Sequence, residues 1–110
     1  MAEFIKGDIV VVPFPFSNLA EIKKRPAFIV NKLAGDDIIL CQITSKTIKD
    51  KYSIAIKNGD FAFGSLSINS NIRPNRIFTA DKNIILYKVG SLEKKKVEEV
   101  IEKIIKIVKS

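Results

Sequence analysis

A chain of 110 residues has room for one hydrophobic core, and a content of 46% hydrophobic and 28% charged residues is typical of a folded domain rather than a disordered segment. The formal net charge of +7 favours a polyanionic partner, such as a nucleic acid or an acidic protein segment. The chain has no histidine and one cysteine, and it lacks a carboxylate cluster at ligand spacing, which disfavours a metal site, an internal disulfide and a Cys–His nucleophile. We therefore expect residues 1–110 to form a single domain that needs no cofactor.

The sequence has no apolar run that approaches the roughly 18 residues of a membrane span. Residues 1–6 also lack the apolar segment of a signal peptide. We expect a cytoplasmic protein without a membrane partner, in which Cys41, within an apolar run, is a small buried hydrophobic residue.

The first half of the chain reads as three strands joined by polar turns. A β-branched run after Gly7-Asp8 predicts the first strand, which we expect prolines 13 and 15 to end early. Residues 17–24 read as a loop, and Pro26 is expected to open the second strand. A turn at residues 34–37 makes the second and third strands a hairpin. The predicted strands are Ile9–Phe14, Pro26–Asn31 and Ile38–Ser45.

The second half reads as four short strands followed by a helix. Alternating apolar and polar residues predict the strands, one of which Pro74 is expected to stop. Ser91 is a suitable N-cap for the helix, whose apolar residues form one stripe at helical spacing. The predicted elements are strands Tyr52–Ile56, Leu66–Arg73, Ile77–Thr79 and Ile84–Val89, and a helix Leu92–Lys109. Together they predict a mainly β fold, a small bent β-barrel with a C-terminal α-helix.

Two N-terminal motifs resemble the MazF/PemK toxin family. These are Gly7-Asp8, an apolar run and Pro13-Phe14-Pro15-Phe16, and the strand that begins with Arg25-Pro26. The resemblance implies an SH3-like barrel and a sequence-selective, metal-independent endoribonuclease, the toxin of a toxin–antitoxin pair. It also implies a homodimer that binds single-stranded RNA and an acidic antitoxin protein.

RNA cleavage by the ribose 2′-hydroxyl suits a chain without histidine or a Cys–His nucleophile, because the substrate supplies its own nucleophile. The protein must align the 2′-oxygen and stabilise charge on the phosphorane, and the product carries a 2′,3′-cyclic phosphate. Arginine suits this task because its planar fork fits phosphate oxygens. The family resemblance implies catalytic roles for Arg25 and for Thr44, which the predicted hairpin makes neighbours. Ser45 is the alternative to Thr44 if the register is shifted by one residue.

Further residues are candidates for binding RNA through cationic, amide, hydroxyl or aromatic groups. Several surround the expected catalytic pair, and others belong to the Arg73-Pro74-Asn75-Arg76 cluster and the polar side of the strand before it. The candidates are Phe16, Lys23, Lys24, Ser45, Asn69, Asn71, Arg73 and Arg76.

The same basic surface also suits a protein that binds without cleaving. The resemblance extends to the CcdB type, which acts on DNA gyrase by contact, and a plain single-strand nucleic-acid-binding module is a third interpretation. Neither alternative needs Arg25 beside Thr44. Discrete cuts in RNA in the presence of EDTA distinguish the nuclease from both.

Overall fold

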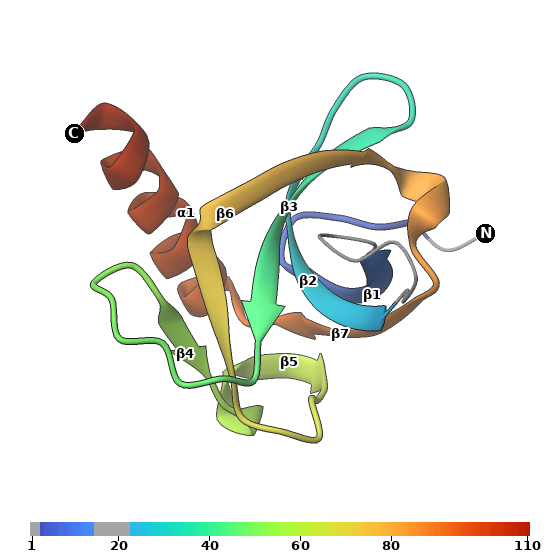
Figure 1. The fold of residues 1–110 in the computed structure, drawn as a ribbon. Coiled ribbons are helices and arrows are strands. Elements are labelled where there is room, and N and C mark those ends of the chain that lie inside the picture. The colour runs from blue at the N-terminus through green and yellow to red at the C-terminus, as the bar shows by residue number, and fades with distance from the viewer. Residues whose placement is uncertain (1–2, 15–22) are drawn as a thin grey trace.

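A strongly curled antiparallel sheet and one helix make up the computed structural model, which describes residues 3–14 and 23–110 (Figure 1). The strands are β1 (Asp8–Phe14), β2 (Lys23–Lys32), β3 (Asp37–Thr44), β4 (Ile54–Ile56), β5 (Phe61–Gly64), β6 (Ser70–Asp81) and β7 (Tyr87–Leu92). Two 3₁₀ turns (Asn58–Asp60 and Lys82–Ile84) precede β5 and β7, and helix α1 (Lys94–Lys109) follows β7. The predicted mainly β fold with a C-terminal helix is confirmed.

The seven strands lie in the order β4-β6-β3-β2-β1-β7-β5, with every neighbouring pair antiparallel. The predicted hairpin of the second and third strands is present as β2 and β3. The ends of the sheet are its two shortest strands, β4 and β5. The curl brings both of them to the same side of the molecule (Figure 1).

Both faces of the central strands are buried, which explains why their apolar runs are continuous rather than alternating. One cluster packs beneath α1 and includes Ile9, Phe28 and the fully buried Val100 of the helix. The other lies on the opposite face of the sheet and includes Val10 and Ile29. Cys41 belongs to the first cluster and is fully buried, as predicted.

Three prolines of the described chain lie inside strands instead of bounding them. Pro13, which was expected to end the first strand, pairs with Lys24 within β1. Pro26 pairs with Val11 within β2, which begins at Lys23, so the prediction of a loop through Lys24 was wrong. A proline is accommodated there because the recorded pairing of β2 with β3 begins only at the next residue. Pro74 lies within β6, which unites two predicted strands. Residues 74–76 form a bulge without partners on β3, and a bulge tolerates a proline.

Further boundaries differ from the prediction. The predicted strand Ile84–Val89 is β7, which begins at Tyr87 and ends at Leu92. Strand β5 was not predicted, and residues 65–69 form the β5–β6 loop rather than the start of a strand. Helix α1 begins after Glu93, so the prediction that Ser91 is its N-cap was wrong. The Ser91 hydroxyl instead donates a hydrogen bond to the fully buried carboxylate of Asp8, which also pairs with Lys88 Nζ at 3.2 Å. Ser91 therefore joins β7 to β1.

Within the described ranges, no helix is long and apolar enough to cross a membrane.

Candidate functional site

Polar side chains from three adjacent strands share one face of the sheet. Gln42 of β3 pairs with Ala27 of β2 on one side and with Arg73 of β6 on the other, and Thr44 pairs with Asn71. The β2–β3 pairing ends at Ala27 and Gln42, and extending this register by two residues would set Arg25 across from Thr44. Since side chains alternate along a strand, Arg25, Thr44 and Asn71 lie on the same face, and we call these three residues the polar row.

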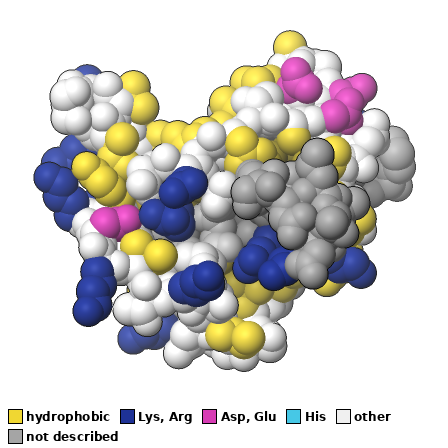
Figure 2. Space-filling model, viewed as in Figure 1, with side chains coloured by type: hydrophobic (Ala, Val, Ile, Leu, Met, Phe, Trp, Pro, Cys, Tyr) yellow, Lys and Arg dark blue, Asp and Glu magenta, His cyan; other side chains and the backbone are white. Residues whose placement is uncertain are grey.

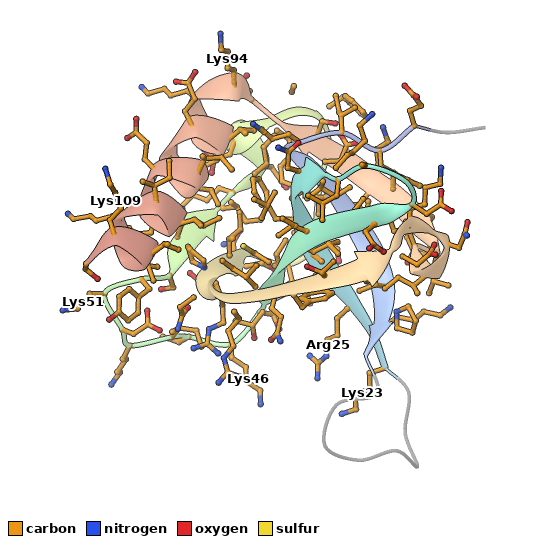
Figure 3. The ribbon with its side chains drawn as sticks, turned by 90° about the horizontal axis from the view of Figure 1, so that it is seen from above. Lys23, Arg25, Lys46, Lys51, Lys94 and Lys109 are labelled. Atoms are coloured by element: carbon orange, nitrogen blue, oxygen red, sulfur yellow. The ribbon has the colours of Figure 1, made fainter. Side chains whose placement is uncertain are left out.

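Arg25 is the cation of the polar row, and it is partly exposed near the start of β2, where it pairs with Val12 of β1. Its guanidinium makes no hydrogen bond or ion pair with the residues that the structure describes. Figure 3 shows its side chain directed outward at the same end of the molecule as Lys23 and Lys46, while Lys94 lies at the opposite end. Five N–H donors are thus available to a phosphate group.

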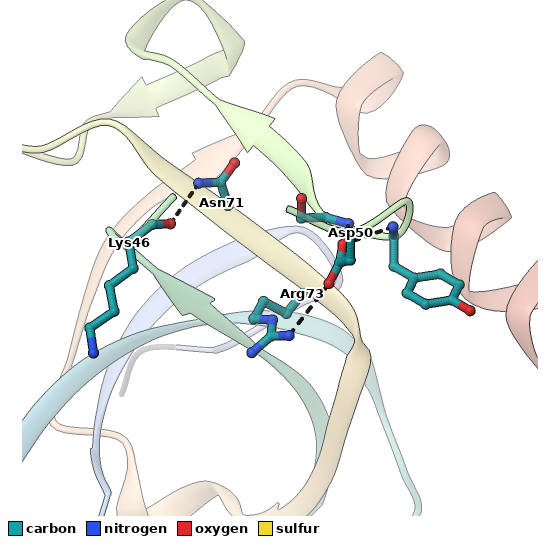
Figure 4. A network of polar contacts seen from close by, with 6 residues as sticks. Lys46, Asp50, Asn71 and Arg73 are labelled. Carbon is teal, nitrogen blue, oxygen red and sulfur yellow. Dashed lines mark hydrogen bonds and ion pairs between the residues drawn. The ribbon is translucent and has the colours of Figure 1, made fainter. Parts of the chain in front are cut away.

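Thr44 and Asn71 both form hydrogen bonds with the backbone of Lys46, two residues after Thr44. The Thr44 Oγ1 accepts a hydrogen bond from the backbone N–H of Lys46 at 3.1 Å. The Asn71 Nδ2 donates to the backbone oxygen of Lys46, also at 3.1 Å (Figure 4). The Thr44 hydroxyl keeps its proton for donation to a ligand. The exposed Lys46 was missed by the sequence reasoning, because its placement depends on these two contacts.

Arg73 forms an ion pair with Asp50 of the same chain. Its Nη2 lies 3.5 Å from Asp50 Oδ2 in the β3–β4 loop (Figure 4). The side chain is 19% exposed, and its buried Nε has no hydrogen-bond partner among the described residues. The backbone N–H groups of Ser53 and Tyr52, followed by the charge of Arg73, lower the pKa of the Asp50 carboxyl. The structure therefore places Arg73 as a tie between β6 and this loop, with part of its guanidinium left for another acceptor.

A pocket of about 250 Å³ adjoins Arg25, between the start of β2, the end of β3 and the β5–β6 loop. Ser45, the first residue after β3, lines it together with Ile43, Leu66, Ser67 and Ile68. Ser45 therefore belongs to the pocket, whereas Thr44 belongs to the polar row. The β5–β6 loop contribution was missed because these residues read as part of a strand.

The other sequence-predicted candidates surround this region at the surface. Lys23 and Lys24 are exposed at the start of β2, Asn69 is exposed in the β5–β6 loop, and Arg76 is exposed in the bulge of β6. The candidate Phe16 lies outside the described residues. On the face seen in Figure 2, Lys and Arg side chains are spread over the lower half, while most visible acidic side chains lie at the upper right.

In the described part of the chain, no group of three or more His, Cys, Asp or Glu side chains comes together in a way that could hold a metal ion.

The fold is similar to several solved structures. The chain aligns with MazF (Form-I) from Deinococcus radiodurans at a TM-score of 0.78 and 14% identity, covering 100% of both chains. It aligns with MazE-MazF (Form-III) from the same organism at 0.77 and 14%, covering 96% of this chain and 95% of the other. An endoribonuclease from a mycobacterial species aligns at 0.72 and 12%, covering 99% and 94%.

The sequence comparison is more specific than these structural similarities. No curated protein sequence matches the chain. The family model described as PemK-like, MazF-like toxin of type II toxin-antitoxin system matches residues 5–108, nearly the whole sequence. The chain therefore belongs to the PemK-like, MazF-like family of type II toxins.

Proposed function

We propose that this toxin is a metal-independent endoribonuclease that cleaves single-stranded RNA by attack of a ribose 2′-oxygen on the adjacent phosphorus. The O2′–P bond forms as the P–O5′ bond breaks; the 2′-hydroxyl loses a proton and O5′ gains one. The products are a 2′,3′-cyclic phosphate and a 5′-hydroxyl. Structural relatives described as endoribonucleases support this assignment.

The proposal rests on the partly exposed guanidinium of Arg25, which pairs with no described residue. The β2–β3 register, extended by two residues, sets it across from Thr44. Because a guanidinium stays protonated, its role is to stabilise negative charge on the phosphorane rather than to remove a proton. Two of its N–H groups fit two phosphate oxygens at once. The Thr44 hydroxyl donates to a remaining oxygen, since its own oxygen already accepts from Lys46 N–H.

The surrounding cations bind the RNA strand on either side of the cut. The exposed cations here are Lys23, Lys24, Lys46 and Arg76. Each lysine contacts a phosphate as a single charge, and the arginine contacts it with two N–H groups of its planar guanidinium. Asn69 and Ser45 offer groups that hydrogen-bond base edges. Arg73 contributes through the part of its guanidinium that Asp50 does not occupy.

The test is incubation of the purified protein with a long single-stranded RNA in the presence of EDTA. We expect discrete cuts that end in cyclic phosphate, their positions set by the base sequence. Arg25→Ala should lower the cleavage rate by about 10²–10³-fold, the usual effect of losing one donor to a developing charge. The charge-matched control is Lys94→Ala, at the opposite end of the molecule (Figure 3). Intact RNA with a gel shift would instead indicate a binding module.

We further propose that the toxin acts as a homodimer and that an acidic antitoxin segment competes with RNA. Relatives solved as MazE-MazF and as an endoribonuclease with its cognate antitoxin support a protein partner of this kind. A domain this small needs a second subunit to make a groove several nucleotides long. The antitoxin segment would neutralise the cations that bind RNA: Lys23, Lys24, Arg25, Arg73 and Arg76.

The mass of the protein in solution tests the dimer, and a salt titration with an uncleavable RNA tests the basic surface. Contact with about four phosphates predicts a slope of about −3 for log affinity against log salt. An acidic peptide should displace the RNA. A monomer whose RNA affinity does not depend on salt would contradict both parts of this assignment.

A further inference from the structure

The pocket beside Arg25 has a chemistry that the cleavage reaction itself does not use. It has a volume of about 250 Å³, and its charged lining residues are Lys24 and Arg25, both cationic. The described residues place no carboxylate in its lining. A ligand that carries negative charge at one edge is therefore compatible with its rim.

The inner surface combines apolar walls with hydroxyl groups. Ile43 is buried at its base, Leu66 is partly buried, and Ile68 is 62% exposed, so an apolar surface remains uncovered. The hydroxyls of Ser45 and Ser67 make no hydrogen bond with any described residue. Each can both donate and accept, which suits the mixed donors and acceptors on the edge of a nucleobase.

The position of the pocket relates it to the polar row. Ser45 follows Thr44 directly, and because successive side chains of a strand point to opposite faces, the pocket lies across the end of β3 from Thr44. Arg25 belongs to both, since it lies in the row and lines the pocket. A phosphate at Arg25 and a base in the pocket would therefore belong to the same nucleotide or to adjacent ones.

We propose that this pocket holds one unpaired base next to the scissile phosphate and that Ser67 and Ile68 determine which base is accepted. The inference rests on the proposed function, whose substrate it specifies. Apolar walls contact the base face and serine hydroxyls read its edge, the usual division of labour in single-stranded RNA recognition. The Ser70 hydroxyl, which donates to the Ile68 backbone oxygen at 2.9 Å, holds the loop residue in place.

The first experiment compares cleavage profiles on a pool of random-sequence RNA. Ser67→Ala should change base preference at a single position beside the cut by up to about tenfold, the effect of one hydrogen bond. Ser65→Ala, an exposed serine of the same loop that does not line the pocket, is the matched control and should leave the profile unchanged. Equal profiles for wild type and Ser67→Ala would overturn the assignment of Ser67.

The second experiment measures binding without cleavage. Ile68→Trp fills the pocket at an exposed position, and an uncleavable RNA is made with an abasic site at each nucleotide in turn. Wild-type protein should lose about tenfold in affinity at one abasic position, as expected when the apolar contact with one base is lost, and Ile68→Trp should lose that position dependence. A uniform response of the wild type to all abasic positions would overturn the pocket, even where cleavage is normal. An RNA that binds with this position dependence but is not cut would contradict the proposed function and leave the pocket supported.

Discussion

The side chain of Asn71 donates a hydrogen bond of 3.1 Å to the backbone oxygen of Lys46, 25 residues earlier in the chain. The backbone N–H of the same Lys46 donates to Thr44 Oγ1, so the lysine is held on both sides. Its flexible side chain then extends from a fixed origin at the end of the molecule where Arg25 lies (Figure 3). Asn71, which the sequence suggested as a reader of base edges, therefore uses one of its two N–H donors to hold Lys46.

Lys46→Ala should weaken RNA binding uniformly over sequences and reduce the salt slope by about 0.7, the contribution of one phosphate contact to a single strand. The reason is that an exposed lysine fixed beside the polar row contacts the RNA backbone and not its bases. The measurement is a salt titration with an uncleavable RNA, and Lys94→Ala is the control. Lys46→Arg should retain the slope. An unchanged slope in Lys46→Ala would remove this residue from the RNA surface.

Thr44→Val should lower the cleavage rate by about 10²–10³-fold, because the isosteric side chain can no longer donate to a phosphorane oxygen. Thr44→Ser should keep most of the activity. The matched control is Thr79→Val, because Thr79 is exposed near the end of β6, whereas Asn71 of the polar row lies near its start. Single-turnover rates at saturating RNA separate the chemical step from binding. Wild-type rates in Thr44→Val would show that the row acts through Arg25 without a hydroxyl.

Asp50→Asn should flatten the acid limb of the stability curve. The pKa of Asp50 lies below its ordinary value of 3.8, chiefly because the Ser53 and Tyr52 N–H groups and then Arg73 favour the carboxylate. A lowered pKa in the folded state contributes stability above the unfolded pKa, which is lost as the pH falls through the folded value. Urea unfolding between about pH 6 and pH 2 measures this. Asp37→Asn, at an exposed site, reports the general effect of removing one carboxylate. Parallel curves for wild type and Asp50→Asn would contradict the prediction.

Cys41 should not react with iodoacetamide in the folded protein. Burial raises the pKa of its thiol to about 12, so the thiolate is scarce at neutral pH, and the sulfur is enclosed in the core. Alkylation measured by mass should therefore follow the unfolded fraction as urea is added. Fast alkylation in native buffer would show that β3 opens locally at this point.

The parts of the fold predicted from sequence are those set by local pattern. The apolar stripe of α1 and the hairpin of β2 and β3 depend on residues close in the chain, and both are present. Pro26 and Pro74 were misread as boundaries because their tolerance depends on which neighbouring strand pairs at that residue. Ser91 was misread as a helix cap because its partner, Asp8, lies 83 residues away.

The same distinction applies to the site. The hairpin of β2 and β3 is present, while the adjacency of the Arg25 and Thr44 side chains stays a prediction, because the pairing of the two strands ends at Ala27 and Gln42. The tie between Arg73 and Asp50, 23 residues apart, depends on how the β3–β4 loop returns to β6, which no local pattern reports. Lys46 and the pocket residues Ser67 and Ile68 were missed for the same reason.

The two outermost strands of the sheet have a consequence for behaviour at high concentration. An exposed sheet edge is a template for pairing with another chain, and the danger grows with the length of the edge. Here one edge is β4, with 3 residues, and the other is β5, with 4 residues that end at Gly64. Neither offers a long run of consecutive backbone groups, so the described part of the sheet presents only short edges for pairing with another chain.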